Sequence, residues 1–557
     1  MRKRMNWTSM AMTLCLVLTV LAGCFKDKDA YKPSETSSSN NGQAVESDWK
    51  NEQTKKWHVG QNVDLYWYIG FPWHTNLKDW NEYSFLKDVK EITGVNPIVN
   101  VPTGDPTEKI NIMIATGDLP DLITLGLHDP AVDKLIKSGL VYSLDELMDT
   151  YSPEFRKEIP QDVYDASKSE IDQKLYGMPG GYLPDWLLKA KDGIGAYTYS
   201  VRKDIYAELG KPDMTTPDSF YETLKAFKEK YPMINGRPSI PLAIGDNTQL
   251  ETSPPIYSLM HSFGVKDHYV QPDGKVTVKF KNPQYKEFAK YMNKLYREKL
   301  IDAEAFVKGE TQIQEDLRSN VFASAAYFWY LDGANAALDQ AKPDSHFVSI
   351  APLQAVEDVK FPGLARLGGQ ITLVSKKSKN PEAAIKFLRY MFSKDGNLLM
   401  LYGHEGEDYS INAEGKITRS DAIQQAWAKD FPALKDRTGI WSFVYLFYKP
   451  LPEVGKEAPD RMEHDRPIAN KYAFDNTIVS YKMTPDLTTE EGIVSSKVDE
   501  IAAKSLPKIV MAVSEADAVK MVDEMIGHME KAGLSKLEIY LTKQYNLNVE
   551  KFGNDKY

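Results

Sequence analysis

The chain has 557 residues, of which 42% are hydrophobic and 26% charged, and its formal net charge is −10 at pH 7. A chain of this length is too long to fold around one hydrophobic core, so we expect at least two domains. The mildly acidic balance and the lack of a basic stripe argue against nucleic acid as a partner. With two cysteines, Cys15 and Cys24, the sequence offers neither a disulfide framework nor a thiolate metal site.

Residues 1–23 have the features of a lipoprotein signal peptide. Three basic residues at positions 2–4 precede AMTLCLVLTVLAG, an apolar run too short to span a bilayer comfortably. The run ends in LAGC (21–24), which resembles a bacterial lipobox, and this motif implies a diacylglycerol on Cys24. A signal peptide or signal anchor with an incidental cysteine is the alternative. We expect a lipid-anchored protein on the outer face of the cytoplasmic membrane.

The segment after the signal is expected to be a tether. Cleavage removes 23 residues and three of the 68 basic ones, leaving 534 residues with 65 basic and 78 acidic side chains. Residues 25–57 are rich in Ser, Asn, Lys, Asp and Glu and nearly free of branched apolar residues. Such a segment cannot bury enough surface to offset its ordering entropy, so we assign 24–57 to the lipidated cysteine and a flexible tether.

Short apolar runs alternate with helical patterns in the remaining chain, which predicts an α/β fold. VDLYWYIG (63–70) is apolar at almost every position, as expected of a strand covered on both faces. Similar strands are predicted at 97–101 and 121–126, separated by a helix that ends at Gly117.

Local start and turn signals appear later in the chain. Asn380-Pro381 and Thr216-Pro217 each predict the start of a helix. Asp273-Gly274 predicts a hairpin turn within 271–278. Two α/β lobes with added helices are therefore the expected architecture.

Motifs of common enzymes are missing from the sequence. There is no phosphate-binding loop and no Gly-x-Ser-x-Gly element, and Gly193-Ile194-Gly195 lacks the third glycine of a dinucleotide fingerprint. His404-Glu405 begins like a zinc-protease helix, but position 408 is Asp. We expect no catalytic residues and no cofactor, although a carboxylate pair of a glycan hydrolase or lyase stays an alternative.

Aromatic clusters near predicted strand ends favour a binding protein for sugars, because pyranose rings present apolar faces rimmed by hydroxyls. In LYWYIGFPWH (65–74), Trp67 is predicted to be core and Tyr68 to lie at the border. Phe71 and Trp73 follow the strand's carboxyl end, where crevices form in α/β sheets, and are predicted ligand residues.

Further candidates are weighed against structural roles. Tyr182 and Trp186 form another aromatic cluster, and Trp441 is ambiguous between packing and a ligand platform. Asp121 lies in a helix-to-strand turn, where turn formation explains it as well as hydroxyl binding does. Arg202, just after a predicted strand, contacts either the ligand or a structural ion-pair partner.

Several stretches together resemble one family. They are KINIMIATGDLPDLITL (109–125), GLVYSLDELMDTYSPEF (139–155), KLYGMPGG (174–181), YSVRKDIYAELGKPDMTTPDSFYETLKAFKEKYP (199–232) and KNPEAAIKFLRYMFSKDGNLLMLYGHEGEDYS (379–410). The chain resembles the extracellular solute-binding proteins of ABC importers, in the sugar-binding class and its large Gram-positive lipoprotein subgroup. The resemblance covers roughly residues 60–545 in order.

The resemblance implies a two-lobed periplasmic-binding-protein-like fold of type II, with parallel-rich sheets flanked by helices and an interlobe ligand cleft. We place lobe one at 58–178 plus 352–396 and lobe two at 179–351 plus 397–557. The resemblance also implies cleft roles for Trp329 in FWYLDGAN and for Glu405 and Tyr409 in GHEGEDY.

The expected function is capture of a small polar solute, an oligosaccharide or a peptide, by lobe closure, followed by delivery to the membrane subunits of an ABC permease. A monomer is expected. The competing hypotheses are the surface-anchored glycan hydrolase or lyase and a surface receptor or adhesin for a protein. A metal ion bound by carbonyl and carboxylate oxygens stays open.

Overall fold

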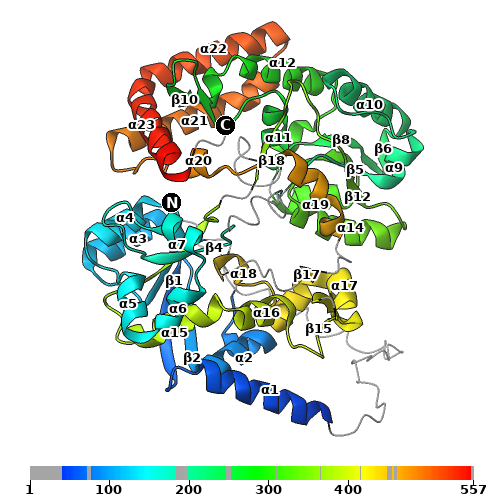
Figure 1. Ribbon diagram of the computed structural model, residues 1–557. Helices are drawn as coiled ribbons and strands as arrows, with labels where there is room; N and C mark the ends of the chain where they lie inside the picture. The colour runs from blue at the N-terminus through cyan, green and yellow to red at the C-terminus, as the bar shows by residue number, and fades with distance from the viewer. Residues whose placement is uncertain are drawn as a thin grey trace, which may run out of the picture. The chain divides into compact units, whose positions relative to one another are not determined.

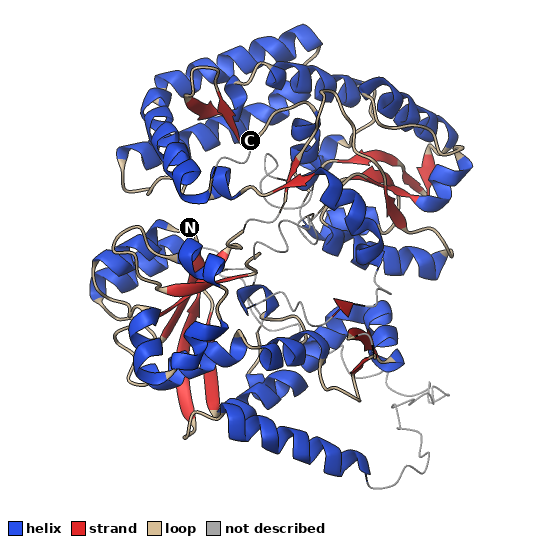
Figure 2. Cartoon of the chain, viewed as in Figure 1, coloured by secondary structure: helices blue, strands red, loops and turns tan. Residues whose placement is uncertain are grey.

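The computed structural model describes residues 41–557, except for 72–73, 75–76, 184–194, 196, 246–252, 309, 364–365, 414, 448–454, 457–460 and 554–557. Residues 53–557 form one unit, separate from residues 1–52. Two mixed sheets surrounded by helices organise residues 53–557 (Figure 2).

The first sheet has the strand order β2–β1–β3–β14–β4. Its strands β1, β2 and β4 are labelled in Figure 1. Its strands are β1 (Val63–Ile69), β2 (Val95–Asn100), β3 (Leu122–Gly126), β4 (Gly177–Gly180) and β14 (Gln370–Val374). β1 is parallel to β2 and β3, whereas β14 is antiparallel to β3 and β4. The three predicted strands are confirmed, with β2 starting two residues earlier than expected.

Helices cover both faces of this sheet, but not completely. One face shares a core with α3 (Pro106–Thr116) and α4 (Pro130–Lys137), and the other contacts α15 (Pro381–Met391) and α18 (Val444–Phe447). The expectation that β1 is covered on both faces is wrong for its first half, because Tyr66 is 56% exposed. The α3 side of the sheet is covered only from Tyr68 onward.

The remaining elements of this lobe lie around the sheet. They are η2 (Trp80–Glu82), α2 (Ser84–Thr93), α5 (Leu144–Tyr151), α6 (Pro153–Glu158), α7 (Gln161–Ser167), α16 (Lys394–Tyr402), β15 (Tyr409–Ile411), β16 (Lys416–Arg419), α17 (Asp421–Thr438) and β17 (Gly455–Lys456). The predicted end of α3 at Gly117 is confirmed, since Gly117 adopts a left-handed conformation with φ of 69°.

The second sheet has the strand order β12–β5–β11–β8. Its strands are β5 (Ser200–Arg202), β8 (Ile240–Ala243), β11 (Val321–Ser324) and β12 (Phe347–Ser349). β8 and β11 are parallel, and β5 runs antiparallel to β11 and β12. The carboxyl ends of β8, β11 and β12 therefore share one edge with the amino end of β5.

Helices and small sheets complete the second lobe. They are α9 (Lys203–Glu208), α10 (Pro217–Lys230), β6 (Met233–Ile234), β7 (Arg237–Pro238), α11 (Pro254–Ser262), β9 (His268–Val270), β10 (Val276–Val278), η4 (Lys279–Lys281), α12 (Gln284–Arg297), η5 (Ala303–Phe306), α13 (Glu310–Leu317), α14 (Phe328–Ala341), α19 (Arg461–Tyr472), α20 (Thr477–Ser480), α21 (Glu490–Val510), α22 (Glu515–Lys531) and α23 (Leu534–Phe552). The predicted helix starts at Pro217 and Pro381 are confirmed, as is the hairpin turn at Gly274.

The chain passes between the lobes more often than the expected boundaries allow. Within 397–557, which we assigned to lobe two, α16 and α17 pack on α2 and α18 packs on β4 and β14. Strands β13 (Phe361–Pro362) and β18 (Ala473–Phe474) pair in parallel between these segments. Farther on, Tyr481 lies in the lobe-one core and Met483 in the lobe-two core. The local sequence of a helix does not indicate which of the two lobes it packs on.

The expected tether is partly helical. α1 (Asn41–Trp57) occupies its second half, because NGQAVESDWKNEQTKKW contains good helix formers and no interior proline. Its last residue, Trp57, is 6% exposed and donates from Nε1 to Asp395 Oδ2 at 2.9 Å. Of the described helices, none has the length and apolar character that a membrane span requires.

Candidate functional site

The carboxyl edge of the first sheet gathers the ends of β1, β3 and β4 with the start of β14. This edge is where ligand crevices form in α/β sheets. Phe71 follows β1 here and is half-buried, and Tyr182 follows β4 and is 3% exposed. The structure thus brings these two predicted ligand residues to one edge, and their contact with a ligand stays a prediction.

Tyr68 and Trp67 lie below this edge, on opposite faces of β1. The Tyr68 hydroxyl donates to the Pro106 carbonyl at 3.1 Å, and burial, followed by the charges of Asp129 and Asp105, raises the pKa of Tyr68 to about 12. Tyr68 is only 1% exposed, so its ring belongs to the core, and ligand contact stays a prediction. Trp67 is fully buried, as predicted for a core residue, and donates to Thr124 Oγ1 at 2.8 Å.

Other groups at this edge were missed by sequence reasoning. Gln370 begins β14 and pairs with Gly126 on β3 and with Gly180 on β4. His128 follows β3, and burial together with nearby Lys482 and Lys551 lowers its pKa to about 4, so it is neutral at pH 7. In the sequence, Gly70 follows β1, and β3 and β4 each end in a glycine, Gly126 and Gly180. Only the strand register shows that the last two flank Gln370.

The carboxyl edge of the second sheet carries the aromatic segment after β11. Tyr327 forms an isolated antiparallel bridge with Tyr197, and the two rings meet edge to face at 5.5 Å between centroids. Trp329 is the second residue of α14, directly beyond this bridge. Its backbone therefore lies at the expected edge, while its side chain is outside the described part of the structure.

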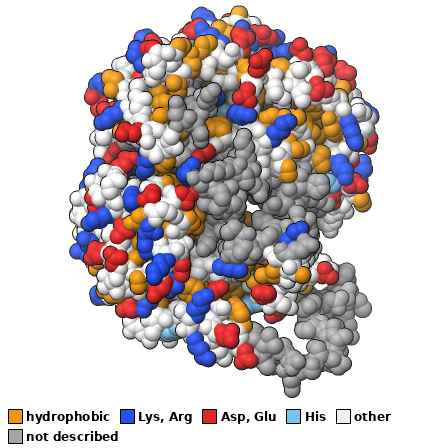
Figure 3. Space-filling view, viewed as in Figure 1, with side chains coloured by type: hydrophobic (Ala, Val, Ile, Leu, Met, Phe, Trp, Pro, Cys, Tyr) orange, Lys and Arg blue, Asp and Glu red, His pale blue; other side chains and the backbone are white. Residues whose placement is uncertain are grey.

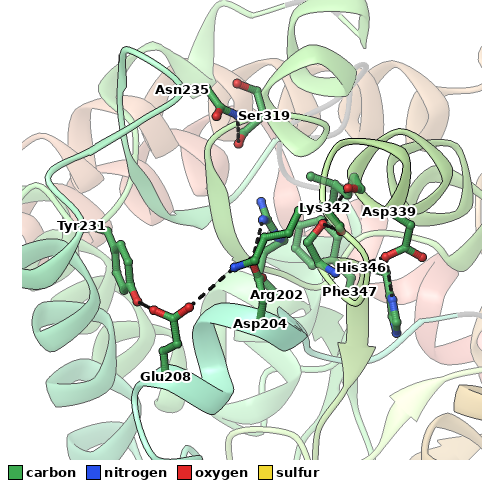
Figure 4. A network of polar contacts seen from close by, with 12 residues as sticks. Arg202, Asp204, Glu208, Tyr231, Asn235, Ser319, Asp339, Lys342, His346 and Phe347 are labelled. Carbon is green, nitrogen blue, oxygen red and sulfur yellow. Dashed lines mark hydrogen bonds and ion pairs between the residues drawn. The ribbon is translucent and has the colours of Figure 1, made fainter.

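Arg202 lies at the opposite edge of the second sheet, because it ends the antiparallel strand β5. Its Nη2 is 3.3 Å from Asp204 Oδ2, and the two side chains are 7% and 9% exposed. Lys342 also contacts Asp204, at 3.1 Å, and Glu208, at 3.6 Å (Figure 4). Glu208 in turn accepts a hydrogen bond from the hydroxyl of Tyr231. This location favours the structural ion pair over ligand contact.

Asp121 is likewise at the edge away from the crevice, since it precedes β3. Its Oδ2 accepts a hydrogen bond from the Tyr66 amide at 2.9 Å, and its Oδ1 accepts one from the Ser378 hydroxyl at 2.5 Å. Both carboxylate oxygens therefore tie β1 and the segment before α15 to β3. The turn-forming role left open by the sequence is the one that these contacts favour.

The GHEGEDY segment forms a turn between α16 and β15 rather than a helix. His404 is held between two carboxylates, with Nε2 2.8 Å from Asp88 Oδ2 and Nδ1 3.0 Å from Asp408 Oδ2. Burial lowers the pKa of His404, but the hydrogen bonds to Asp408 and Asp88 outweigh it and raise the pKa to about 9. His404 is therefore a charged residue that joins this turn to α2. Asp408 stands at the position where a zinc-protease helix would carry its second histidine.

The predicted site residues of this region differ in exposure. Glu405 is exposed, whereas Tyr409 is 4% exposed in a small core with Tyr402. Trp441 is half-buried with a left-handed φ of 62°, and its ring meets Trp427 edge to face at 5.8 Å. Packing and ligand contact both stay open for these three residues.

Three predicted site residues lie outside the described part of the structure, namely Trp73, Trp186 and the lipidation site Cys24. Among the described side chains, no group of three His, Cys, Asp or Glu residues is arranged to hold a metal ion. Lys and Arg side chains are interspersed with Asp and Glu on the face seen in Figure 3, the pattern of a solvated surface.

The family model for bacterial extracellular solute-binding proteins matches residues 82–398. This chain belongs to that family, as the resemblance in its sequence predicted. The expected two-lobed α/β fold of type II is also confirmed. It is the fold of the solved structures that resemble this one.

Two characterised relatives are similar in sequence. The fructooligosaccharide ABC transporter substrate-binding protein FusA of Streptococcus pneumoniae is 31% identical over 242 residues, 41% of this chain and 43% of FusA. That alignment thus spans less than half of FusA. Lipoprotein LipO of Bacillus subtilis is 23% identical over 477 residues, 83% of this chain and 88% of LipO.

Solved structures show the same fold at lower identity. FusA of S. pneumoniae in complex with kestose has a TM-score of 0.65 at 19% identity and covers 87% of this chain and 99% of its own. The alginate-binding protein AlgQ2 without calcium ion has a TM-score of 0.61 at 21% identity, covering 88% and 99%.

Proposed function

We propose that this protein is a lipid-anchored extracellular solute-binding protein that captures an oligosaccharide by lobe closure and delivers it to an ABC permease. The observation that carries the proposal is the continuous match of residues 82–398 to the family, on a fold shared with FusA in complex with kestose. Lobe closure follows from the general behaviour of two-lobed binding proteins, in which contacts from both lobes favour the closed state.

The chemistry of the described edges supports a sugar as ligand. Phe71 at the lobe-one edge and Tyr327 at the lobe-two edge are half-buried and supply aromatic surface, whereas Tyr182 and Tyr197 are buried at these edges. The amide of Gln370 supplies a planar polar group for hydroxyls. Anchoring through Cys24 is supported by the LAGC motif and by similarity to a protein named as a lipoprotein.

Titration calorimetry on the mature chain tests the ligand class. The panel contains kestose, nystose, alginate oligomers, mannose-containing N-glycan fragments and peptides of similar length. We expect micromolar or tighter binding of at least one saccharide and weaker binding in Trp73→Ala. Saturable binding of peptides alone, or turnover of a glycan, would overturn the oligosaccharide proposal.

The anchor has its own test. Mass spectrometry of the membrane-associated protein should find a diacylglyceryl group on residue 24, and Cys24→Ala should release the protein from cells. An unmodified Cys24 in membrane-bound protein would exclude the lipid anchor. Permease delivery is tested by loss of ligand uptake in cells that lack the protein.

A further inference from the structure

The carboxyl-terminal helix α23 contacts the cores of both lobes. Leu534, Leu537 and Leu541, in its first half, lie in the core of lobe two. Phe552, its last residue, packs against the core of lobe one. The helix has 19 residues and is therefore roughly 28 Å long. It reaches from one core to the other rather than belonging to a single lobe.

Two hydrogen bonds tie α23 to the chain where the chain leaves lobe one. Tyr481 lies in the lobe-one core, and the next residue, Lys482, turns the chain toward lobe two with a left-handed φ of 53°. The Tyr540 hydroxyl donates to the Lys482 carbonyl at 2.7 Å. The side-chain amide of Asn548, which is fully buried, donates to the Tyr481 carbonyl at 2.7 Å. We call residues 481–486 and α23 together the strap.

Two ion pairs join residues 481–486 of the strap to α4 of lobe one. Lys482 Nζ lies 3.1 Å and 3.2 Å from the two carboxylate oxygens of Asp133. Asp486 Oδ2 lies 3.3 Å from Lys134 Nζ. The strap thus supplies one cation and one anion, and α4 supplies the opposite charge in each case. This pairing holds the turn at two points on α4.

A third ion pair joins the end of α23 to the segment after α7. Lys551 Nζ lies 3.8 Å from Glu170 Oε1, and Lys482 Nζ lies 3.5 Å from Glu170 Oε2. We call the pairs Lys482–Asp133, Asp486–Lys134 and Lys551–Glu170 the strap ion pairs. Their side chains are 19–36% exposed. Ion pairs that water reaches are weak individually and are screened by salt, so these contacts yield more easily than the core of lobe two does.

The strap follows directly after one of the segments on which the chain crosses between the lobes. Three such segments are joined by hydrogen bonds, because the Leu183 N–H donates to the Arg366 carbonyl at 2.7 Å and the Gly363 N–H donates to the Phe474 carbonyl at 2.8 Å. Crossing segments are where a two-lobed protein bends. Rotation of the lobes about these segments therefore moves the strap relative to lobe one or relative to lobe two. The strap ion pairs are the contacts that break, since the apolar core of lobe two is the firmer attachment.

We propose that the strap is a conformational device: the strap ion pairs stabilise one arrangement of the lobes, and they break when the lobes rotate about the crossing segments. The strap thereby sets the ratio of the two arrangements before a ligand binds. A ligand shifts such an equilibrium only by its differential affinity for the two states, so contacts that break easily keep the equilibrium within reach of a ligand. This inference rests on the lobe closure of the proposed function and is independent of the chemical class of the ligand.

Distances between spin labels on the two lobes test the inference. The labels are placed at Lys87→Cys on α2 and Lys225→Cys on α10, two exposed positions, in mature protein that carries Cys24→Ala. The double variant Asp133→Asn/Glu170→Gln removes two of the lobe-one partners of the strap ion pairs. We expect the population ratio of the two lobe arrangements to change about three- to tenfold, the effect of losing two partly exposed ion pairs.

Salt provides a second measurement that needs no substitution in the strap or its partners. Raising NaCl from about 0.1 M to about 1 M shortens the Debye length from about 10 Å to about 3 Å. The protein with intact strap ion pairs should shift in the same direction as the double variant, and the double variant should respond less to salt.

Glu158→Gln is the matched control, because it breaks an ion pair with Arg389 inside lobe one. The side chains of Glu158 and Arg389 are 37% and 22% exposed, close to the 36% and 20% of Glu170 and Lys551. The control should leave the population ratio unchanged. Thermal unfolding of each variant confirms that the labelled protein is folded.

Ligand affinity has to follow the populations. Calorimetry with kestose on the same variants should find that Kd changes in the direction in which the ligand-bound arrangement gains or loses population. Unchanged distances in the folded double variant, or distances that do not respond to salt when the strap ion pairs are intact, would overturn this inference alone. Wild-type protein that binds no saccharide would overturn the proposed ligand, whereas the distance measurement uses no ligand and still decides the role of the strap.

Discussion

Two polar side chains at sheet edges, Arg202 in lobe two and Gln370 in lobe one, differ in what surrounds them. Arg202 ends a strand at the amino edge of its sheet and is enclosed with Asp204, both side chains being less than 10% exposed. Gln370 begins a strand at the carboxyl edge, between two glycines. The comparison teaches that the sheet edge and the neighbouring residues, rather than residue type, decide whether a polar side chain is enclosed by partners.

The largest effect is expected in the core beside the first sheet. Trp67→Ala removes a fully buried ring that stacks on Phe443 with centroids 5.5 Å apart. We expect the free energy of unfolding to fall by about 3–5 kcal/mol. Urea unfolding measures this loss, and calorimetry on the folded fraction should find ligand affinity nearly unchanged. Weakened binding at full stability would instead place Trp67 in the site.

The second-largest effect on stability is expected from breaking the buried ion pair between Arg202 and Asp204. Asp204→Ala leaves the buried guanidinium of Arg202 without its carboxylate, which is expected to cost about 3 kcal/mol of folding free energy. The double variant Arg202→Met/Asp204→Ala should recover much of this loss, because no buried charge is left. Lys203→Met is the control, since its ion pair with Asp344 is exposed and contributes at most about 1 kcal/mol. If the Arg202→Met variant is stable but binds the ligand more weakly, Arg202 contacts the ligand.

His404 is a structural residue whose positive charge is lost when the pH is raised. Its pKa in the folded protein, about 9, is above the ordinary value of 6.5, so its stabilising contribution is complete below pH 6.5 and disappears as pH rises through 9. We expect wild-type protein to lose on the order of 2 kcal/mol more than His404→Gln between pH 6 and pH 9.5. Urea unfolding at the two pH values measures this difference. Parallel losses in both proteins would mean that His404 is uncharged at pH 7.

The smallest expected effect contrasts two glycines of the same edge. Gly126→Ala should raise the free energy of unfolding by about 0.4–1 kcal/mol, because alanine fits there and restricts the unfolded chain. Gly368→Ala should lower it, since the added Cβ would overlap the Gly180 carbonyl. Thermal unfolding of both variants is the measurement. Equal destabilisation would show that Gly126 is needed by the fold.

Much of the secondary structure could be predicted because its signals are local. The apolar run of β1, the glycine after α3, the capped start at Thr216-Pro217 and the turn at Gly274 each depend on residues close in the chain. Family membership was also readable, since motifs keep their order in the sequence. For polar residues at strand ends, the sequence could not separate a ligand-binding role from a structural one.

The tertiary structure decided which alternative the surroundings favour. Asp121 and Arg202 belong to the edges away from the crevice, and that assignment depends on strand direction, which their own sequences do not encode. Gln370 lies between Gly180 and Gly126, which are about 190 and 240 residues away in the chain, and only the strand register shows this. Sequence by itself determined the family, much of the secondary structure and the abundance of aromatic residues. Strand register and burial, which arise only when distant segments meet, decided which polar groups are enclosed by partners and which lie at the carboxyl edge of a sheet.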